Sequence, residues 1–128
     1  MREKQTLIDY WQSVAAQDEK ALERLFHPDA RIRWHNTNEC FTVGEFIRAN
    51  CEYPGIWHCD VERIEVSDKL FFSITRVWSP AELHAFHAVS FFEISEGKIT
   101  SLDEYWGEDG PAPIWRQAMQ IGTPIKPR

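Results

Sequence analysis

The chain carries its clearest structural signal in residues 83–106, which read LHAFHAVSFFEISEGKITSLDEYW. Two runs rich in aromatic and β-branched residues, 83–94 and 99–106, flank a short polar segment. A Glu-Gly pair between two such runs is typical of a tight β-hairpin. We therefore predict two adjacent antiparallel strands, joined by a two-residue turn that pairs Ile94 with Ile99.

The same hairpin carries acid–base residues inside otherwise apolar strands. With the register of that turn, Val89 faces Glu104, and His87 lies diagonally from Glu104 on the same face of the sheet. An imidazole and a carboxylate on one apolar surface can move a proton next to a carbonyl group. His87 and Glu104 are therefore the candidate catalytic residues, and a buried structural pair is the alternative. A turn one residue longer sets His87 with Asp103 and Tyr105 instead.

Length and composition predict one domain spanning residues 1–128. Hydrophobic residues make up 43% of the chain, which is enough for a core. A net charge of −6 argues against nucleic-acid and anionic-membrane partners. The three cysteines form no CxxC pair, and we expect them to be reduced. With no signal peptide and no apolar run near the roughly 20 residues of a membrane span, we expect a soluble cytoplasmic protein.

The N-terminal half shows helical patterns around one strand. Apolar spacing predicts an amphipathic helix over 4–16, and Asp18 is a candidate N-cap for a second, short helix that ends near Phe26. Residues 30–35 alternate as in a strand with one buried face. A capping box beginning at Thr42 opens a third helix, after a polar loop over residues 36–39.

The C-terminal half reads as strands. Two further β-rich runs, 57–66 and 69–78, precede the hairpin, and 114–119 is a short helical candidate. Helices followed by strands in succession predict an α+β fold, with the helices packed on one face of a curved sheet.

With the predicted register, the face opposite to His87 and Glu104 is also apolar. It carries Phe86, Ala88, Phe92, Ile94, Ile99 and Tyr105. A sheet with a solvated back would be polar there, and few helices remain to cover a second apolar face. We therefore predict a homodimer through this sheet face.

Two motifs carry a family resemblance, FHPDA at residues 26–30 and FFEISEGKI at residues 91–99. With them, the layout of nearly the whole chain resembles the nuclear-transport-factor-2-like superfamily, in particular its SnoaL-like and ketosteroid-isomerase-like branch. The segment YWGEDGPAPIWR at 105–116 looks like a tail found in bacterial members of unassigned function.

The resemblance implies a cone-shaped α+β roll, in which a curved antiparallel or mixed sheet wraps the helices and leaves an internal pocket. In SnoaL-like cyclases an acidic residue on the last strand and a histidine on the neighbouring strand line that pocket. Glu104 and His87 fall at those positions. The acid is usually Asp in the cyclases, and Leu102 stands where their last strand often has a histidine.

An internal pocket needs lining residues, and the chain offers several aromatic candidates and one amide. The candidate substrate-binding residues are Trp34, Phe46, Asn50, Tyr53, Trp57 and Trp106. Each aromatic taken alone is also an ordinary core residue. Asn50 is more informative, because an amide on the inner face of a helix needs a partner.

These observations lead to one functional prediction with two alternatives. We expect a small-molecule-binding protein that acts as a cofactor-independent acid–base enzyme of isomerase, cyclase or dehydratase type on a small apolar carbonyl, cyclic or aromatic compound. The alternatives are a non-catalytic ligand-binding module and a structural dimer. The sequence has no phosphate loop or dinucleotide fingerprint, so we expect no cofactor. His84 and His87 point to opposite faces of a strand, so we expect no metal.

Overall fold

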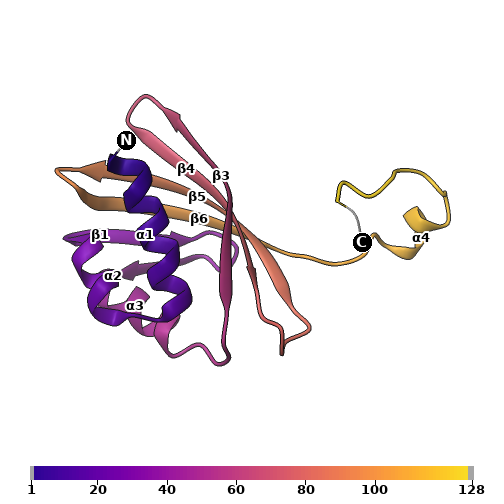
Figure 1. Ribbon diagram of the computed structural model, residues 1–128, viewed down its shortest axis with the longest axis horizontal. Coiled ribbons are helices and arrows are strands. Elements are labelled where there is room, and N and C mark those ends of the chain that lie inside the picture. The colour runs from indigo at the N-terminus through magenta and orange to yellow at the C-terminus, as the bar shows by residue number, and fades with distance from the viewer. Residues whose placement is uncertain (1, 127–128) are drawn as a thin grey trace.

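The computed structural model describes residues 2–126 and places three helices against one face of a curved sheet (Figure 1). The helices are α1 (Arg2–Ala16), α2 (Glu19–Leu25) and α3 (Val43–Cys51). The Asp18 side chain accepts a hydrogen bond from the Ala21 backbone N–H at the start of α2, as predicted. Asp18 thereby satisfies one of the backbone donors that a helix start leaves free.

The capping box at the start of α3 is also confirmed. The Thr42 hydroxyl accepts from the backbone N–H of Glu45, and the Glu45 carboxylate accepts from the backbone N–H of Thr42. Two donors at the helix start are thus satisfied by side chains three residues apart.

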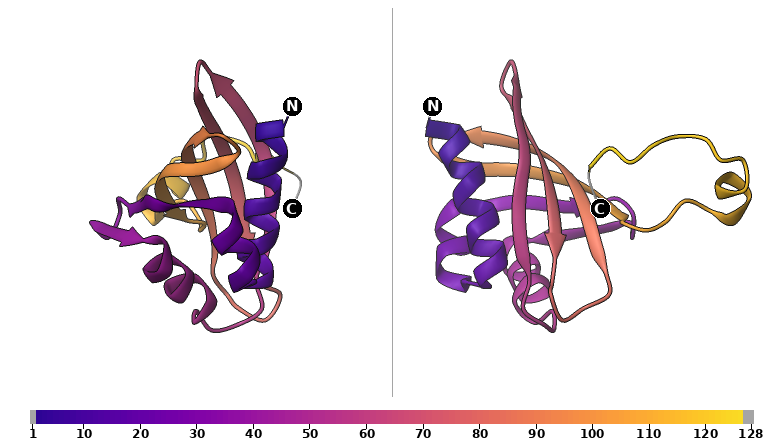
Figure 2. Two further views of the ribbon diagram at one scale, coloured as in Figure 1. Left: turned by 90° about the vertical axis from the view of Figure 1, so that its left-hand side faces the viewer. Right: turned by 45° about the vertical axis from the view of Figure 1, so that its right-hand side comes forward.

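Six strands form one open, mixed sheet in the order β2-β1-β6-β5-β4-β3. Strands β1 and β6 are parallel, and all other neighbours are antiparallel. The strands are β1 (Phe26–Trp34), β2 (Glu39–Thr42), β3 (His58–Ser67), β4 (Leu70–Trp78), β5 (Ala85–Ser95) and β6 (Lys98–Glu108). The α+β class with helices on one face of a curved sheet is therefore confirmed, as the two further views also show (Figure 2).

Two local predictions near the start of the sheet were wrong. Phe26 does not end the second helix but begins β1, and Glu39 is not in a loop but begins β2. The pairing of β2 with β1 is antiparallel from Trp34–Glu39 to Arg31–Thr42. A four-residue edge strand has too short a pattern to be recognised from its own residues.

The hairpin turn follows its prediction. Glu96 and Gly97 both have positive φ, 51° and 78°, as the two central residues of a type I′ turn require. Ser95 pairs with Lys98, and Ile94 pairs with Ile99.

The register changes one step beyond the turn. Glu93 pairs with Ser101, so Thr100 is an extra residue on β6 and makes a β-bulge. The Thr100 hydroxyl donates to the Glu93 carbonyl oxygen across the bulge. Because side chains alternate with period two, one extra residue reverses which β6 side chains share a face with β5.

The predicted pairing of His87 with Glu104 is therefore wrong. Ser90, rather than Val89, lies opposite Glu104, and His87 lies opposite Gly107. Glu104 and Ser90 face the helices and are fully buried, whereas His87 lies on the other face of the sheet. The inner face, toward the helices, thus carries Glu104 and Ser90. The outer face, away from the helices, carries His87.

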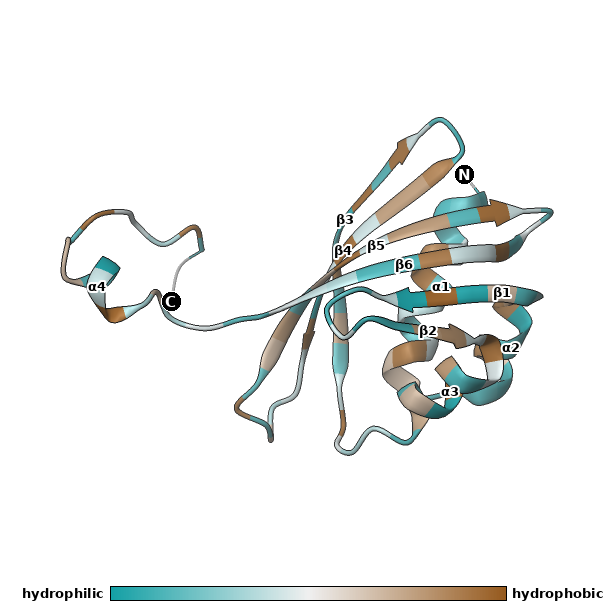
Figure 3. Ribbon diagram, turned by 180° about the vertical axis from the view of Figure 1, so that it is seen from behind, coloured by the Kyte–Doolittle hydropathy of each residue, from teal (hydrophilic) through white to brown (hydrophobic). Residues whose placement is uncertain are grey.

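The predicted members of the outer face also change with the bulge. Ala88, Phe92 and Ile99 are fully buried against the helices, and Phe86 and Ile94 pack against the same core. Figure 3 views the sheet from the side opposite to α1 and shows its outer face. The outer face carries a different apolar set, namely Phe72, Ile74, Val89, Phe91 and Tyr105.

The chain continues past β6 into a segment that leaves the domain. It contains the short helix α4 (Ile114–Gln117), close to the predicted 114–119, and it extends well beyond the end of the sheet (Figures 1 and 2). Within residues 2–126, none of the helices is both long enough and apolar enough to cross a membrane.

Replacement of Gly97 tests the hairpin turn. We expect Gly97→Ala to lower the free energy of unfolding by about 1–2 kcal/mol in urea titrations, because an L side chain is strained at positive φ. A Cβ there would also lie 2.6 Å from the Arg2 guanidinium. Gly110→Ala is the control, because a Cβ at Gly110 meets no atom within 4 Å and we expect no measurable change. Equal losses in the two variants would contradict the turn assignment.

Candidate functional site

A cavity of about 390 Å³ lies between the ends of α1 and α3 and the inner face of the sheet. Its wall is almost entirely apolar, and its mouth lies near the exposed residues Thr37 and Tyr53. The lining residues are Val14, Gln17, Trp34, Asn36, Thr37, Ala49, Asn50, Tyr53, Trp57, Cys59, Val77, Phe86 and Trp106.

Five of the six predicted substrate-binding residues line this cavity. They are Trp34, Asn50, Tyr53, Trp57 and Trp106. Phe46, the sixth, does not line it. Its ring is buried in the core and packs against Tyr10 and Phe26, at centroid distances of 6.1 and 5.7 Å.

The aromatic rings form a nearly continuous wall along the cavity. The Phe86 ring lies 6.1 Å from Trp57 on one side and 6.1 Å from Trp106 on the other, measured between ring centroids. Trp106 in turn lies 6.5 Å from Trp34, and Trp57 lies 5.5 Å from Tyr53. Such a wall suits a flat apolar ligand, since aromatic surfaces contribute both area and ring-to-ring contacts.

Two polar residues of the lining hold the backbone in place. Gln17 Nε2 donates to the carbonyl oxygens of Asn50 and Tyr53, at 2.9 and 2.8 Å, and so satisfies the end of α3. Asn50 Nδ2 donates to the Val14 carbonyl oxygen at 3.2 Å, which is the partner that an amide at this position needs. Within residues 2–126 no hydrogen bond reaches the side-chain oxygens of Gln17 and Asn50, so these two oxygens are free to accept one.

The oxygen and the nitrogen of the Asn36 side chain, at the mouth of the cavity, both bond to the backbone. Its side chain accepts from the backbone N–H of Trp106 and donates to the Trp106 carbonyl oxygen, both at 2.6 Å. This side chain therefore extends the sheet ladder and holds Trp106 against the cavity.

Glu104 lies behind the cavity wall rather than in it. Its carboxylate is fully buried and accepts from Ser90 Oγ at 2.6 Å, Trp34 Nε1 at 3.0 Å and Tyr10 Oη at 3.2 Å. Trp34 lines the cavity with its ring while its N–H binds Glu104. The indole thus separates the carboxylate from any ligand.

Burial raises the pKa values of Glu104 and of the neighbouring Cys59. Desolvation raises the pKa of Glu104, and hydrogen bonds from Ser90, Trp34 and Tyr10 offset part of that increase. Desolvation, together with the nearby Glu104 charge, raises the pKa of the Cys59 thiol to about 12. Cys59 lines the cavity as a neutral thiol and is therefore not an activated nucleophile.

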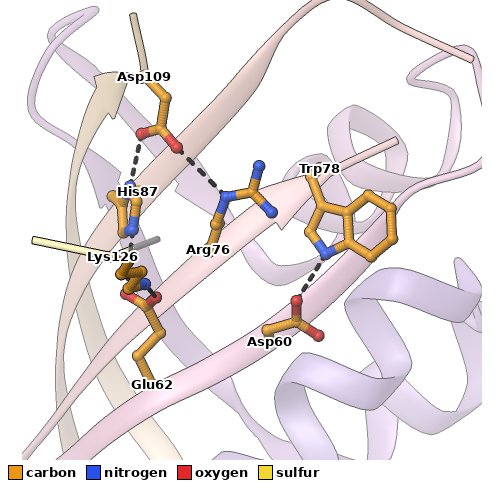
Figure 4. Close-up of polar contacts among 7 residues, drawn as sticks. All are labelled: Asp60, Glu62, Arg76, Trp78, His87, Asp109 and Lys126. Atoms are coloured by element: carbon orange, nitrogen blue, oxygen red, sulfur yellow. Dashed lines mark hydrogen bonds and ion pairs between the residues drawn. The ribbon is translucent and has the colours of Figure 1, made fainter. Parts of the chain in front are cut away.

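His87 belongs to a polar cluster on the outer face, which Figure 4 shows. Its Nδ1 lies 2.5 Å from an Asp109 oxygen, and its Nε2 lies 3.0 Å from a Glu62 oxygen. Arg76 Nε lies 3.4 Å from the other Asp109 oxygen. Both His87 contacts are donor hydrogen bonds only when both ring nitrogens carry a proton. His87 thus fastens the end of β6 to the sheet and has no access to the cavity.

The arrangement supports binding more directly than catalysis. The lining supplies mainly apolar area and no ionised group, and within residues 2–126 its buried Trp106 Nε1 has no hydrogen-bond partner. In the described part of the chain, residues 2–126, no group of three His, Cys, Asp or Glu side chains could hold a metal ion.

Sequence reasoning missed several lining residues. Phe86 appears on the inner face only once the bulge at Thr100 is known. Gln17 follows α1 at a positive φ of 52°, and no periodic pattern marks such a connecting residue. Cys59 and Val77 pair with each other on β3 and β4. The alternation of side-chain faces along these strands could have identified both as residues of the inner face.

Comparison of the structure with solved structures identifies the fold. A protein of Kribbella flavida, described as a candidate ketosteroid isomerase, matches with a TM-score of 0.80 and 20% identity over 98% of this chain and 92% of that chain. An NTF2-like protein of unknown function from Burkholderia xenovorans matches with a TM-score of 0.78 and 22% identity over 98% and 96%.

A candidate SnoaL-like polyketide cyclase of Shewanella putrefaciens matches with a TM-score of 0.70 and 15% identity, over 83% of this chain and 90% of that chain. No protein-family model matches the sequence, and no curated protein matches it. The chain therefore has the NTF2-like cone fold that SnoaL-like and ketosteroid-isomerase-like proteins share, and these comparisons establish the fold alone.

The burial of Glu104 predicts a pH dependence of stability. Because the folded-state pKa is raised above its ordinary value of 4.5, the native protein binds this proton more tightly than the unfolded chain. The free energy of unfolding then falls as the pH rises from 4.5 through the folded-state pKa. We expect Glu104→Gln to lack this fall, so that its stability relative to wild type increases with pH in urea titrations from pH 4.5 to about pH 8.

Glu23→Gln provides the matched control, because Glu23 is an exposed carboxylate on α2. Its stability relative to wild type is expected to stay constant over the same range. A constant difference between Glu104→Gln and wild type would show that burial does not raise the Glu104 pKa.

Proposed function

We propose that this protein binds a small, flat, largely apolar molecule in the cavity between α3 and the sheet. The observation that carries the proposal is an open, aromatic-lined volume of about 390 Å³ beside a filled core. Natural ligand pockets have volumes of about 300–1,000 Å³ and mostly apolar walls with few polar groups. Core packing normally leaves few voids larger than a water molecule.

The polar groups of the cavity narrow the ligand class. The unoccupied side-chain oxygens of Gln17 and Asn50 suit a ligand that carries one hydrogen-bond donor, such as a hydroxyl group. Steroid and polyketide are the compound classes named for two structural neighbours, and both contain ring systems. A hydroxylated ring compound of modest size therefore fits the cavity best.

Acid–base catalysis is the second candidate function, with Glu104 as the residue that transfers the proton. A buried carboxyl whose pKa is raised above its ordinary value can carry a proton in acid–base chemistry. It lies one indole ring behind the cavity, so catalysis requires the Trp34 side chain to move aside. His87 is not part of this candidate, because it lies on the outer face.

We also propose a homodimer through the outer face of the sheet. Phe72 and Phe91 lie with ring centroids 5.3 Å apart, and Phe91 lies 6.0 Å from Tyr105. These rings are partly exposed in the single chain, with Tyr105 at 46%. Apolar patches of this kind mark protein interfaces, and a two-fold axis pairs such a patch with itself.

Filling the cavity tests the binding function. We expect Ala49→Phe to weaken binding of 2-naphthol by at least about tenfold in isothermal titration calorimetry, because the added ring occupies the ligand volume. Ala81→Phe adds the same ring on an exposed loop outside the cavity and is expected to bind like wild type. Failure of the wild-type protein to bind 2-naphthol, or equal affinities of both variants, would contradict the proposed site.

Isomerisation of 3-cyclohexen-1-one to its conjugated isomer tests the second function. If Glu104 carries the proton, wild type accelerates the increase in ultraviolet absorbance, and Glu104→Gln loses about 100-fold or more of that rate. Binding of 2-naphthol by Glu104→Gln is expected to be unchanged, because Glu104 does not line the cavity. A wild-type protein without activity, or a variant that retains it, excludes Glu104 from this chemistry.

A further inference from the structure

The segment after β6, residues 110–126, has no cover from its own domain; we call it the C-terminal arm. Every one of its residues is exposed. The arm is nevertheless ordered locally, since α4 has its own backbone hydrogen bonds and Gln117 Nε2 donates to the Ala112 carbonyl oxygen at 2.6 Å. Figures 1 and 3 show the arm standing away from the sheet and helices.

The exposed side chains of the arm are large and apolar. The most exposed are Ile114 at 79%, Trp115 at 65%, Met119 at 56%, Ile121 at 61% and Ile125 at 99%. Scattered surface hydrophobics are ordinary, but five on one segment of 17 residues are a signature of an interaction surface. A Trp and an Ile side by side are typical anchors of a protein interface.

The start of the arm is fastened to the outer face of the sheet. The Asp109 backbone N–H donates to the Ala85 carbonyl oxygen at 2.8 Å, and the Asp109 carboxylate contacts His87 and Arg76 on that face. Pro111 and Pro113 follow at once and restrict the chain to extended conformations. The arm is thereby directed past the end of its own sheet.

The charges of the arm and the domain are opposite. The arm, residues 110–126, contains two basic residues and no acidic one, whereas residues 1–109 contain eleven basic and twenty acidic residues. One contact already shows this complementarity, because Lys126 Nζ bonds to Glu62 beside His87 (Figure 4). A basic, apolar arm therefore fits an acidic domain with an apolar sheet face.

Two of the structural neighbours align with this chain over nearly its whole length. The alignments with the Kribbella flavida and Burkholderia xenovorans structures extend over 98% of this chain, and so include most of the arm. Within residues 110–126, Lys126 makes an ion pair to the domain, while the large apolar side chains stay exposed and need another surface to cover them.

We propose that the arm of each protomer crosses to a second copy of this chain and packs on the outer sheet face of that copy. The arm already places α4, which holds Ile114 and Trp115, well beyond the end of its own sheet (Figure 1). The two-fold axis pairs the apolar sets of Phe72, Ile74, Val89, Phe91 and Tyr105 with each other. Trp115 and Ile114 of each arm pack on the sheet of the second copy beside these paired patches. The arms are exchanged reciprocally about a two-fold axis. Lys126, which bonds to Glu62 of its own chain in the single protomer, then bonds to Glu62 of the second copy instead.

This inference rests on the proposed homodimer, and the test separates the two. Sedimentation equilibrium compares the full chain, a chain ending at Asp109, and the double variant Ile114→Ser/Trp115→Ser. We expect the full chain to be dimeric, and the truncated and double-variant chains to dissociate with constants raised by about 30-fold or more. Because every changed residue is exposed in the protomer, far-ultraviolet circular dichroism of the domain is expected to be unchanged.

Leu83→Ser is the matched control, since Leu83 is a fully exposed apolar residue outside the arm. Its dissociation constant is expected to equal that of the full chain. Equal constants for the full and truncated chains would keep the dimer but overturn the role of the arm. A full chain that is monomeric overturns both proposals, and leaves the arm for a partner of another kind.

Cross-linking locates the contact. With p-benzoylphenylalanine in place of Trp115, irradiation is expected to give a covalent dimer, and peptide mapping is expected to join the arm to β4, β5 or β6 of the other copy. Cross-links confined to one chain would overturn the exchange.

Discussion

The structure depends on the three hydrogen bonds that hold the buried carboxyl of Glu104. Burying a carboxylate is unfavourable unless donors replace its water, and here the donors come from α1, β1 and β5 around a residue of β6. One side chain on the last strand thus fixes the position of a helix and of both neighbouring strands. The contact of Tyr10 with Glu104 joins residues 94 positions apart and closes the core around the inner face.

The bulge at Thr100 makes this arrangement possible. Without the extra residue, Glu104 would share a face with His87 rather than with Ser90. The bulge therefore separates two polar systems that lie on neighbouring strands. The inner system around Glu104 supports the core, and the outer system around His87 holds the end of β6 where the C-terminal arm begins.

The NTF2-like fold does not by itself decide what the protein does. The same cone accommodates proteins described as isomerases, cyclases and epoxide hydrolases, so the chemistry depends on the lining of each cavity. In this chain the lining is aromatic, and its polar side chains are engaged mainly with the backbone. These features support ligand binding directly, and the buried Glu104 lies behind the Trp34 indole.

The features that could be predicted from the sequence depend on interactions between residues close together in the chain. The caps at Asp18 and Thr42 and the Glu96-Gly97 turn depend on residues two or three positions apart, so they could be predicted together with the α+β class. Five cavity residues could also be predicted, four from their aromatic side chains and Asn50 from the partner that an amide on the inner face of a helix needs. The tertiary structure alone decided the faces of His87 and Glu104, the core position of Phe46 and the exposure of the C-terminal arm. A single unpaired residue at Thr100 reverses a whole face, and no periodic pattern reports it, because a bulge is defined by the partner strand.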